Sequence, residues 1–143
     1  MRLAALIAWS STACLGLYLL GWQVRGGIGM LRGRGGRQAT SVTRYPVIVI
    51  IGHPVLALAG LALWIAFLAR GELAYAWAAF GVLCSSVLIG LTLLTQWLTG
   101  IGGRHAAQGG GRHVRAWVVV LHGLGGLTTF ILVLITATIS GHR

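Results

Sequence analysis

The sequence predicts an all-α protein: an integral membrane four-helix bundle that forms one domain over residues 1–143. Three observations support this prediction. Hydrophobic residues make up 57% of the chain and charged residues only 8%, against about 25% charged residues in a typical soluble domain. The hydrophobic residues gather in four blocks, each long enough to cross a bilayer core of about 30 Å. The charged residues lie between these blocks or near the chain ends.

The first predicted helix covers residues 3–22 and follows Arg2. It has the length and flanking charge of a signal peptide, but it lacks a clear Ala-x-Ala cleavage site, so a membrane helix is the favoured interpretation. Residues 23–45 are rich in glycine and arginine and have no apolar period, which predicts a loop. A Gly-x-Gly pattern in this loop neither completes a nucleotide-binding fingerprint nor follows a predicted strand.

The second predicted helix covers residues 46–69, and Pro46 suits its first turn. The short turn "RGEL" follows, so the second and third helices are expected to be antiparallel neighbours. The third helix is predicted over 73–98, a second basic loop over 99–115, and the fourth helix over 116–139.

The arginines predict the orientation of the bundle. The two long loops carry eight of the eleven arginines, and basic loops face the cytoplasm. Both termini are therefore expected on the non-cytoplasmic side of the cell's inner (plasma) membrane.

A net charge of +10 would suggest a nucleic-acid partner in a soluble chain. Because the arginines alternate with membrane helices, the lipid bilayer is the expected partner, and nucleic acid is not.

Two histidines lie inside the predicted membrane helices, where ionisable groups are costly and usually functional. His53 is seven residues after Pro46, and His122 is seven residues after Arg115. At 1.5 Å per residue, each imidazole is expected roughly 10 Å into the membrane from the same side. The two helices also run in the same direction, so the imidazoles are predicted to share one plane parallel to the membrane.

Small residues follow each histidine on the same face of its helix. Gly60 follows His53 at i+7, and Gly125 and Gly126 follow His122 within about one helical turn. Such residues would leave space for a broad ring beside the imidazoles. Small-residue packing between membrane helices also explains the glycines, but it does not explain a histidine at one depth on both helices.

Haem b fits this pattern best, because its iron takes axial imidazoles and its propionates need cations. The arginines could also serve topology alone. Two histidines without carboxylate or thiolate make a poor zinc or non-haem iron site, and chlorophyll, which needs one histidine per magnesium, remains an open alternative. The predicted site comprises two iron ligands, three glycines and three arginines at the cytoplasmic helix ends: His53, His122, Gly60, Gly125, Gly126, Arg44, Arg112 and Arg115.

The four-block layout, with "GHP" at 52–54 and "LHGLGG" at 121–126, resembles four-helix b-type cytochrome membrane subunits. This group includes cytochrome b561-like proteins and the haem-bearing anchors of respiratory dehydrogenases. The resemblance implies one bis-histidine haem b on His53 and His122, and electron exchange with quinone or a partner redox protein. Two-haem members need four membrane histidines, whereas the first and third predicted helices have none.

These observations predict a membrane electron-transfer subunit with one haem b near the cytoplasmic side, in a larger redox complex rather than as a stand-alone enzyme. Gln96 could bond a quinone carbonyl, although an interfacial polar cap is the simpler interpretation. The main alternative is a cofactor-free structural or assembly subunit, in which the two histidines hydrogen-bond across helices. A transporter or proton path is a third interpretation, but proton relays usually include membrane carboxylates, and the predicted helices contain none.

Overall fold

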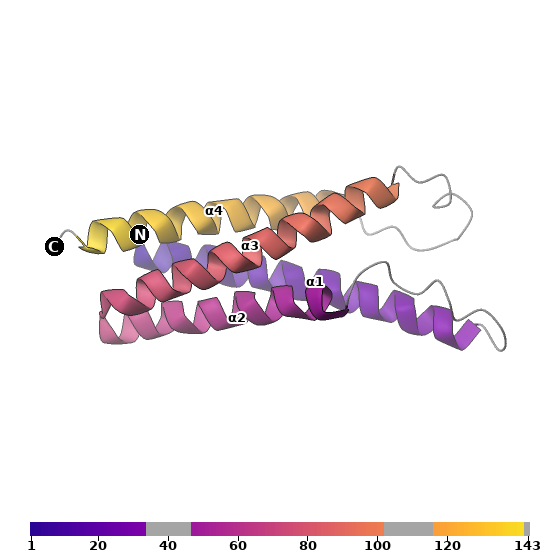
Figure 1. Ribbon diagram of the computed structural model, residues 1–143, viewed down its shortest axis with the longest axis horizontal. Coiled ribbons are helices and arrows are strands. Elements are labelled where there is room, and N and C mark those ends of the chain that lie inside the picture. Colours follow the sequence, from indigo (N-terminus) through magenta and orange to yellow (C-terminus); the bar gives the residue numbers. More distant parts are fainter. Residues whose placement is uncertain (34–46, 102–115, 142–143) are drawn as a thin grey trace.

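The computed structural model describes residues 1–33, 47–101 and 116–141, and these residues form four α-helices. The helices are α1 (Arg2–Gly33), α2 (Val47–Arg70), α3 (Leu73–Ile101) and α4 (Ala116–Gly141), arranged as an elongated bundle (Figure 1). Each contains a segment long and apolar enough to cross a membrane. The prediction of four membrane-spanning helices is therefore confirmed by length and composition.

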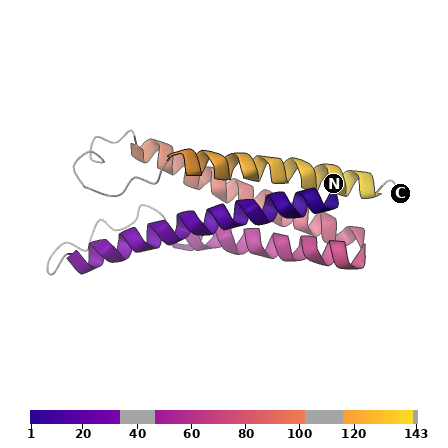
Figure 2. The ribbon, with the colours of Figure 1, turned by 180° about the vertical axis from the view of Figure 1, so that it is seen from behind.

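The two ends of the bundle differ. The start of α1, the α2–α3 turn and the end of α4 lie together at one end, called the terminal end below (Figures 1 and 2). The opposite end, where α1 and α3 finish and α2 and α4 begin, is called the loop end. α1 and α3 diverge in direction as they approach the loop end (Figure 1).

One predicted boundary is wrong. The helix predicted over 3–22 continues as α1 to Gly33, so part of the predicted loop 23–45 is helical. The segment that is hydrophobic enough to cross a membrane does end at Trp22. No proline interrupts the chain there, so the i→i−4 backbone hydrogen bonds continue after the hydrophobic residues stop. The other three helices match the predicted ranges closely.

The bundle consists of two helix pairs. α2 packs most extensively on α3, and α1 packs on α4, whereas the α1–α2 and α3–α4 contacts are less extensive. The α2–α3 pair is joined by a two-residue turn of Gly71 and Glu72. Gly71 adopts a φ of 73°, which favours glycine, and its N–H donates to the Phe67 carbonyl at 2.9 Å. The expected antiparallel neighbours are thus present.

The buried core lies mainly in the terminal half of the bundle. The rings of Trp9 and Trp64 are 6.5 Å apart between centroids, and those of Trp64 and Phe67 are 5.1 Å apart. The Arg2 guanidinium lies 4.7 Å from the Phe67 ring centroid. The core cluster consists of nine buried residues: Ala5, Trp9, Trp64, Phe67, Ala76, Ala79, Leu83, Val133 and Ala137.

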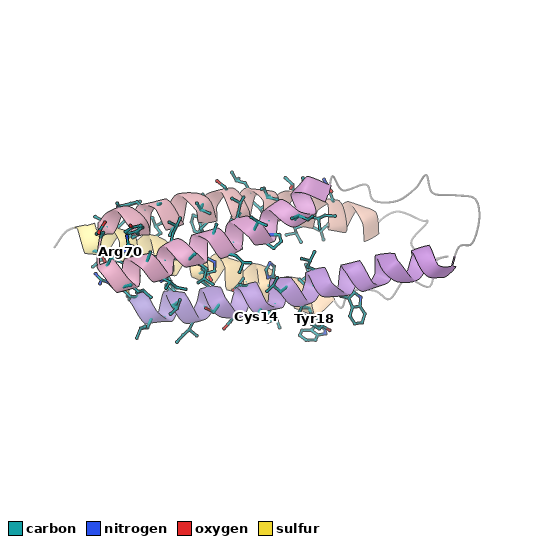
Figure 3. All side chains as sticks on the ribbon, turned by 90° about the horizontal axis from the view of Figure 1, so that it is seen from below. Cys14, Tyr18 and Arg70 are labelled. Atoms are coloured by element: carbon teal, nitrogen blue, oxygen red, sulfur yellow. The ribbon has the colours of Figure 1, made fainter. Side chains whose placement is uncertain are left out.

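The outward faces are apolar and exposed, as lipid contact requires. Large aliphatic side chains point outward on every helix, including Leu17, Ile51, Leu88 and Leu121. Figure 3 shows Cys14 and Tyr18 on the outer side of α1 and Arg70 at the terminal end. Both cysteines are free thiols.

Candidate functional site

The imidazoles of His53 and His122 meet inside the bundle. Their ring centroids are 5.9 Å apart and their planes are nearly perpendicular, at 80°. The histidines come from α2 and α4, which lie diagonally across the described bundle and whose backbones do not approach each other closely. Each is the seventh residue of its helix, counted from the loop end, which is why two parallel helices place them at one depth.

Each imidazole is anchored to a backbone carbonyl of the neighbouring helix in its own pair. His53 Nδ1 lies 2.9 Å from the Ser86 carbonyl on α3, and His122 Nδ1 lies 3.1 Å from the Thr12 carbonyl on α1. A carbonyl oxygen only accepts, so Nδ1 carries the proton in both rings. In a neutral imidazole with this hydrogen bond, Nε2 keeps its lone pair, which is the tautomer that metal-bound histidines adopt.

A glycine lies against each imidazole. A Cβ atom added at Gly16 would come within 2.9 Å of His122 Cε1, and one added at Gly90 would come equally close to His53 Cε1. Each glycine is four residues after the carbonyl that binds the same ring. These positions were not anticipated from the sequence. The available signal was a hydroxyl residue followed by glycine at i+4 on both helices that lack histidine, "TACLG" and "SVLIG".

The site has an approximate two-fold symmetry that exchanges α1 with α3 and α4 with α2. A cavity of about 60 Å³ lies between the two halves and is lined by both histidines. α1 and α3 contribute residues at identical spacing, and His53 and His122 are followed at i+4 by the small residues Ala57 and Gly126. The matched lining residues are Trp9, Thr12 and Ala13 from α1, and Leu83, Ser86 and Val87 from α3.

The three predicted glycines occupy different surroundings. Gly126 lines the cavity, and an added Cβ would meet nothing within 4 Å. At Gly60 an added Cβ would lie 2.7 Å from Trp9 Cζ2, and at Gly125 it would lie 2.5 Å from Thr12 Oγ1. The space expected beside Gly60 and Gly125 is therefore filled by side chains of α1. A helix face alone does not reveal which neighbouring side chain packs onto it.

Trp9 is fixed in place above the cavity, on its terminal side. Its indole N–H donates to the Ala57 carbonyl at 3.1 Å, and its ring packs on Gly60. The aromatic core beyond it separates the cavity from the terminal end.

Several predicted residues lie outside the described ranges. Arg44, Arg112 and Arg115 are among them, so their predicted pairing with propionates stays a prediction. His105, His113 and His142 also lie outside these ranges. Gln96 is half-buried on α3, toward the loop end from Gly90.

The two imidazoles are the candidate metal ligands of this site, and their ring centroids lie 5.9 Å apart. Within residues 1–33, 47–101 and 116–141, no group of three histidine, cysteine, aspartate or glutamate side chains is assembled. A ligand set of two imidazoles suits an iron whose other four donors come from a macrocycle.

Comparison of the chain with known protein families, with curated proteins and with solved structures finds no match.

Proposed function

We propose that the protein is a membrane electron-transfer subunit that holds one haem b between His53 and His122. The observation that carries this proposal is the pair of neighbouring imidazoles, with ring centroids 5.9 Å apart and each Nδ1 bound to a backbone carbonyl. Such outer hydrogen bonds fix the tautomer and the ring orientation of metal-binding histidines. When bound, haem b supplies a one-electron redox couple.

The residues around the pair would serve this role in distinct ways. The Ser86 and Thr12 carbonyls orient the rings, and Gly16 and Gly90 let the helix backbones approach them closely. The aromatic core keeps water out on the terminal side. Arginines of the two predicted basic loops would neutralise the propionates.

The size of the cavity adds a requirement. A volume of about 60 Å³ accommodates the coordination centre but not the rim of a macrocycle. The rim would extend into the α1–α2 and α3–α4 seams, where the helices contact each other least. Haem binding would therefore require the α1–α4 pair to move away from the α2–α3 pair, which would break the bond from the Trp9 N–H to the Ala57 carbonyl.

The proposed topology places the loop end in the cytoplasm and the protein in the inner membrane, because eight arginines flank that end. Electron exchange would then occur on the cytoplasmic side, with quinone or a redox protein. One haem near one face does not bridge the bilayer, so the chain is best suited to a larger redox complex.

The direct test is optical. The protein would be purified in mild detergent from haem-replete cells, and its oxidised and dithionite-reduced spectra recorded with a pyridine haemochrome assay. We expect a low-spin b-type spectrum and one haem per chain. In His53→Ala and His122→Ala the haem should be lost or become high-spin. His53→Asn and His122→Asn are matched variants, because Asn retains a short side-chain N–H donor but no imidazole.

The second candidate is a cofactor-free structural subunit, and a specific observation favours it as well. Both histidines hydrogen-bond across a helix–helix contact, as that role requires. A colourless wild type together with folded, fully assembled Asn variants would support the structural subunit and reject the haem proposal. Coloured wild type and colourless Asn variants would do the reverse.

A further inference from the structure

Residues that contact the two histidines recur at one constant spacing on α1 and α3. Thr12 and Ser86 each supply the carbonyl that binds an imidazole, and Gly16 and Gly90 each lie against one. Both pairs are separated by 74 positions in the sequence. A single register between two helices indicates that whole segments correspond, and not only the residues at the site.

The same register aligns the burial of α1 and α3. Residues 4–22 and 78–96 follow one pattern of buried, half-buried and exposed positions, with two differences in nineteen. The fully buried Ala5 coincides with the fully buried Ala79. The sequences of these segments, which begin "AALIAWSST" and "AAFGVLCSS", match less closely, and apolar helices share residues by chance. The matching burial is the stronger observation, because it reports which face of each helix turns inward.

α2 and α4 correspond in the same way around their histidines. His53 and His122 are 69 positions apart. In this register, residues 55–64 of α2 and 124–133 of α4 have the same burial at all ten positions. The hairpin of α1 and α2, called the first repeat below, thus corresponds helix by helix to the hairpin of α3 and α4, called the second repeat.

The two repeats contact each other reciprocally. His53 of the first repeat binds the Ser86 carbonyl of the second, and His122 of the second binds the Thr12 carbonyl of the first. The most extensive helix contacts, α2–α3 and α1–α4, also run between the repeats, whereas the contacts within each repeat are less extensive. Reciprocal exchange of equivalent contacts is the property of an isologous two-fold interface, the kind that identical subunits form.

We propose that the chain is a fused dimer of one repeated helical hairpin, joined through a self-complementary surface whose partner is a second copy of the same hairpin. The site lies on the approximate two-fold axis of this interface. Each repeat supplies one histidine, together with the carbonyl and the glycine that position the histidine of the other repeat. This inference does not require haem and goes beyond the proposed function.

One pair of matched positions differs between the repeats in a way that offsets size. The first repeat has Trp9 packed on Gly60, where an added Cβ would lie 2.7 Å from the indole. At the matched positions the second repeat has Leu83 and Thr129, so a smaller residue on α3 accompanies a larger one on α4. All four residues are buried. The two-fold register therefore predicts that an indole at position 83 requires a glycine at position 129.

The test places the pair of the first repeat into the second repeat of the full-length chain. Leu83→Trp alone would press the indole against Thr129, whereas Leu83→Trp with Thr129→Gly nearly conserves volume and should pack as Trp9 packs on Gly60. We expect the unfolding equilibrium constant of the double variant to be lower than that of Leu83→Trp by roughly tenfold or more. Denaturation of the purified protein in mixed micelles measures both constants.

Thr136→Gly provides the matched control. Thr136 is also a buried threonine of α4, but it lies seven residues beyond Thr129, about two helical turns away. Leu83→Trp with Thr136→Gly should therefore be no more stable than Leu83→Trp alone. Should Leu83→Trp fail to fold, a folded variant with Thr129→Gly beside an unfolded variant with Thr136→Gly supports the proposal equally.

A second measurement compares the matched glycines. Gly16→Ala and Gly90→Ala create the same 2.9 Å contact in the two halves of the interface, so their unfolding constants should agree within about threefold. The repeat is overturned if Thr129→Gly restores stability no better than Thr136→Gly, or if the glycine variants differ by roughly tenfold or more. None of these measurements uses hemin, so a colourless wild type overturns the haem proposal and leaves this inference standing.

Discussion

Gly16 of α1 lies directly against the imidazole of His122 on α4, close enough that a single methyl group would come within 2.9 Å of Cε1. Gly90 of α3 has the same relationship with His53. The two glycines make room for the imidazoles, and the closeness of the helix backbones lets the rings reach their carbonyl partners.

Replacing either glycine by alanine is expected to displace the adjacent imidazole. Overpacking of this kind costs about 1–3 kcal/mol, so Gly16→Ala and Gly90→Ala should each weaken hemin binding by roughly tenfold or more. Absorbance titration with hemin measures the change. Gly21→Ala on α1 and Gly81→Ala on α3 are matched controls, because nothing lies within 4 Å of a Cβ at either position. Equal losses in the controls and in the test variants would mean that the imidazole contacts are unimportant.

The contact between Trp9 and Gly60 predicts an effect on stability. In Gly60→Ala the new methyl group would lie 2.7 Å from an indole that is hydrogen-bonded in place. We expect the free energy of unfolding to fall by roughly 1–3 kcal/mol, measured by denaturation in mixed micelles. Gly52→Ala on the same helix meets nothing within 4 Å, so it should be neutral or stabilising by up to about 1 kcal/mol. Indistinguishable stabilities for the two variants would contradict the packing described here.

Ser86 contributes to the site through its backbone more than through its hydroxyl. The hydroxyl donates to the His53 carbonyl at 3.3 Å and also lies 3.3 Å from His53 Nδ1, while the backbone carbonyl accepts the imidazole N–H at the shorter distance of 2.9 Å. Ser86→Ala should therefore retain haem and lose about 1 kcal/mol of stability. Thr12→Val should behave similarly at His122, since the Thr12 hydroxyl bonds only within α1. Loss of the b-type spectrum in Ser86→Ala would show that the hydroxyl, and not the carbonyl, holds the ring.

The proposed membrane topology can be tested by thiol labelling in intact cells. With Cys14 and Cys84 replaced by serine, Glu72→Cys places the only thiol in the α2–α3 turn at the terminal end. A membrane-impermeant maleimide added outside should label this thiol, because the arginine bias orients the terminal end outward. Gln38→Cys, in the predicted basic loop, should react only after permeabilisation. The opposite labelling pattern would invert the topology and place the site near the outer face.

The shared level of the two histidines in the bundle could be predicted from the sequence, because helix rise is fixed and both residues are equally far from a helix start. The helix count and three sets of boundaries followed from the same hydrophobic blocks. The end of α1 did not, since hydrophobicity marks where a helix leaves the membrane and not where its backbone hydrogen bonds stop.

The partners of the histidines could not be predicted in this way. A membrane helix is apolar on all faces, so periodicity does not reveal which face of α1 or α3 turns inward. The rotation of α1 and α3 about their own axes decides whether Thr12 and Ser86 contact the imidazoles. It also places Trp9, rather than open space, beside Gly60. These contacts depend on the packing of helix pairs that are far apart in the sequence.

The order of the helices along the chain has a consequence for biogenesis. α2 and α3 form a hairpin across a two-residue turn, so His53 can meet its Ser86 carbonyl as soon as that hairpin has left the ribosome and entered the bilayer. The other pair joins the first helix to the last, and His122 finds the Thr12 carbonyl only after α4 is inserted. A ligand that needs both imidazoles can therefore be retained only after α4 has been synthesised and inserted. A chain truncated before α4 would keep the His53 half of the site and would bind no such ligand.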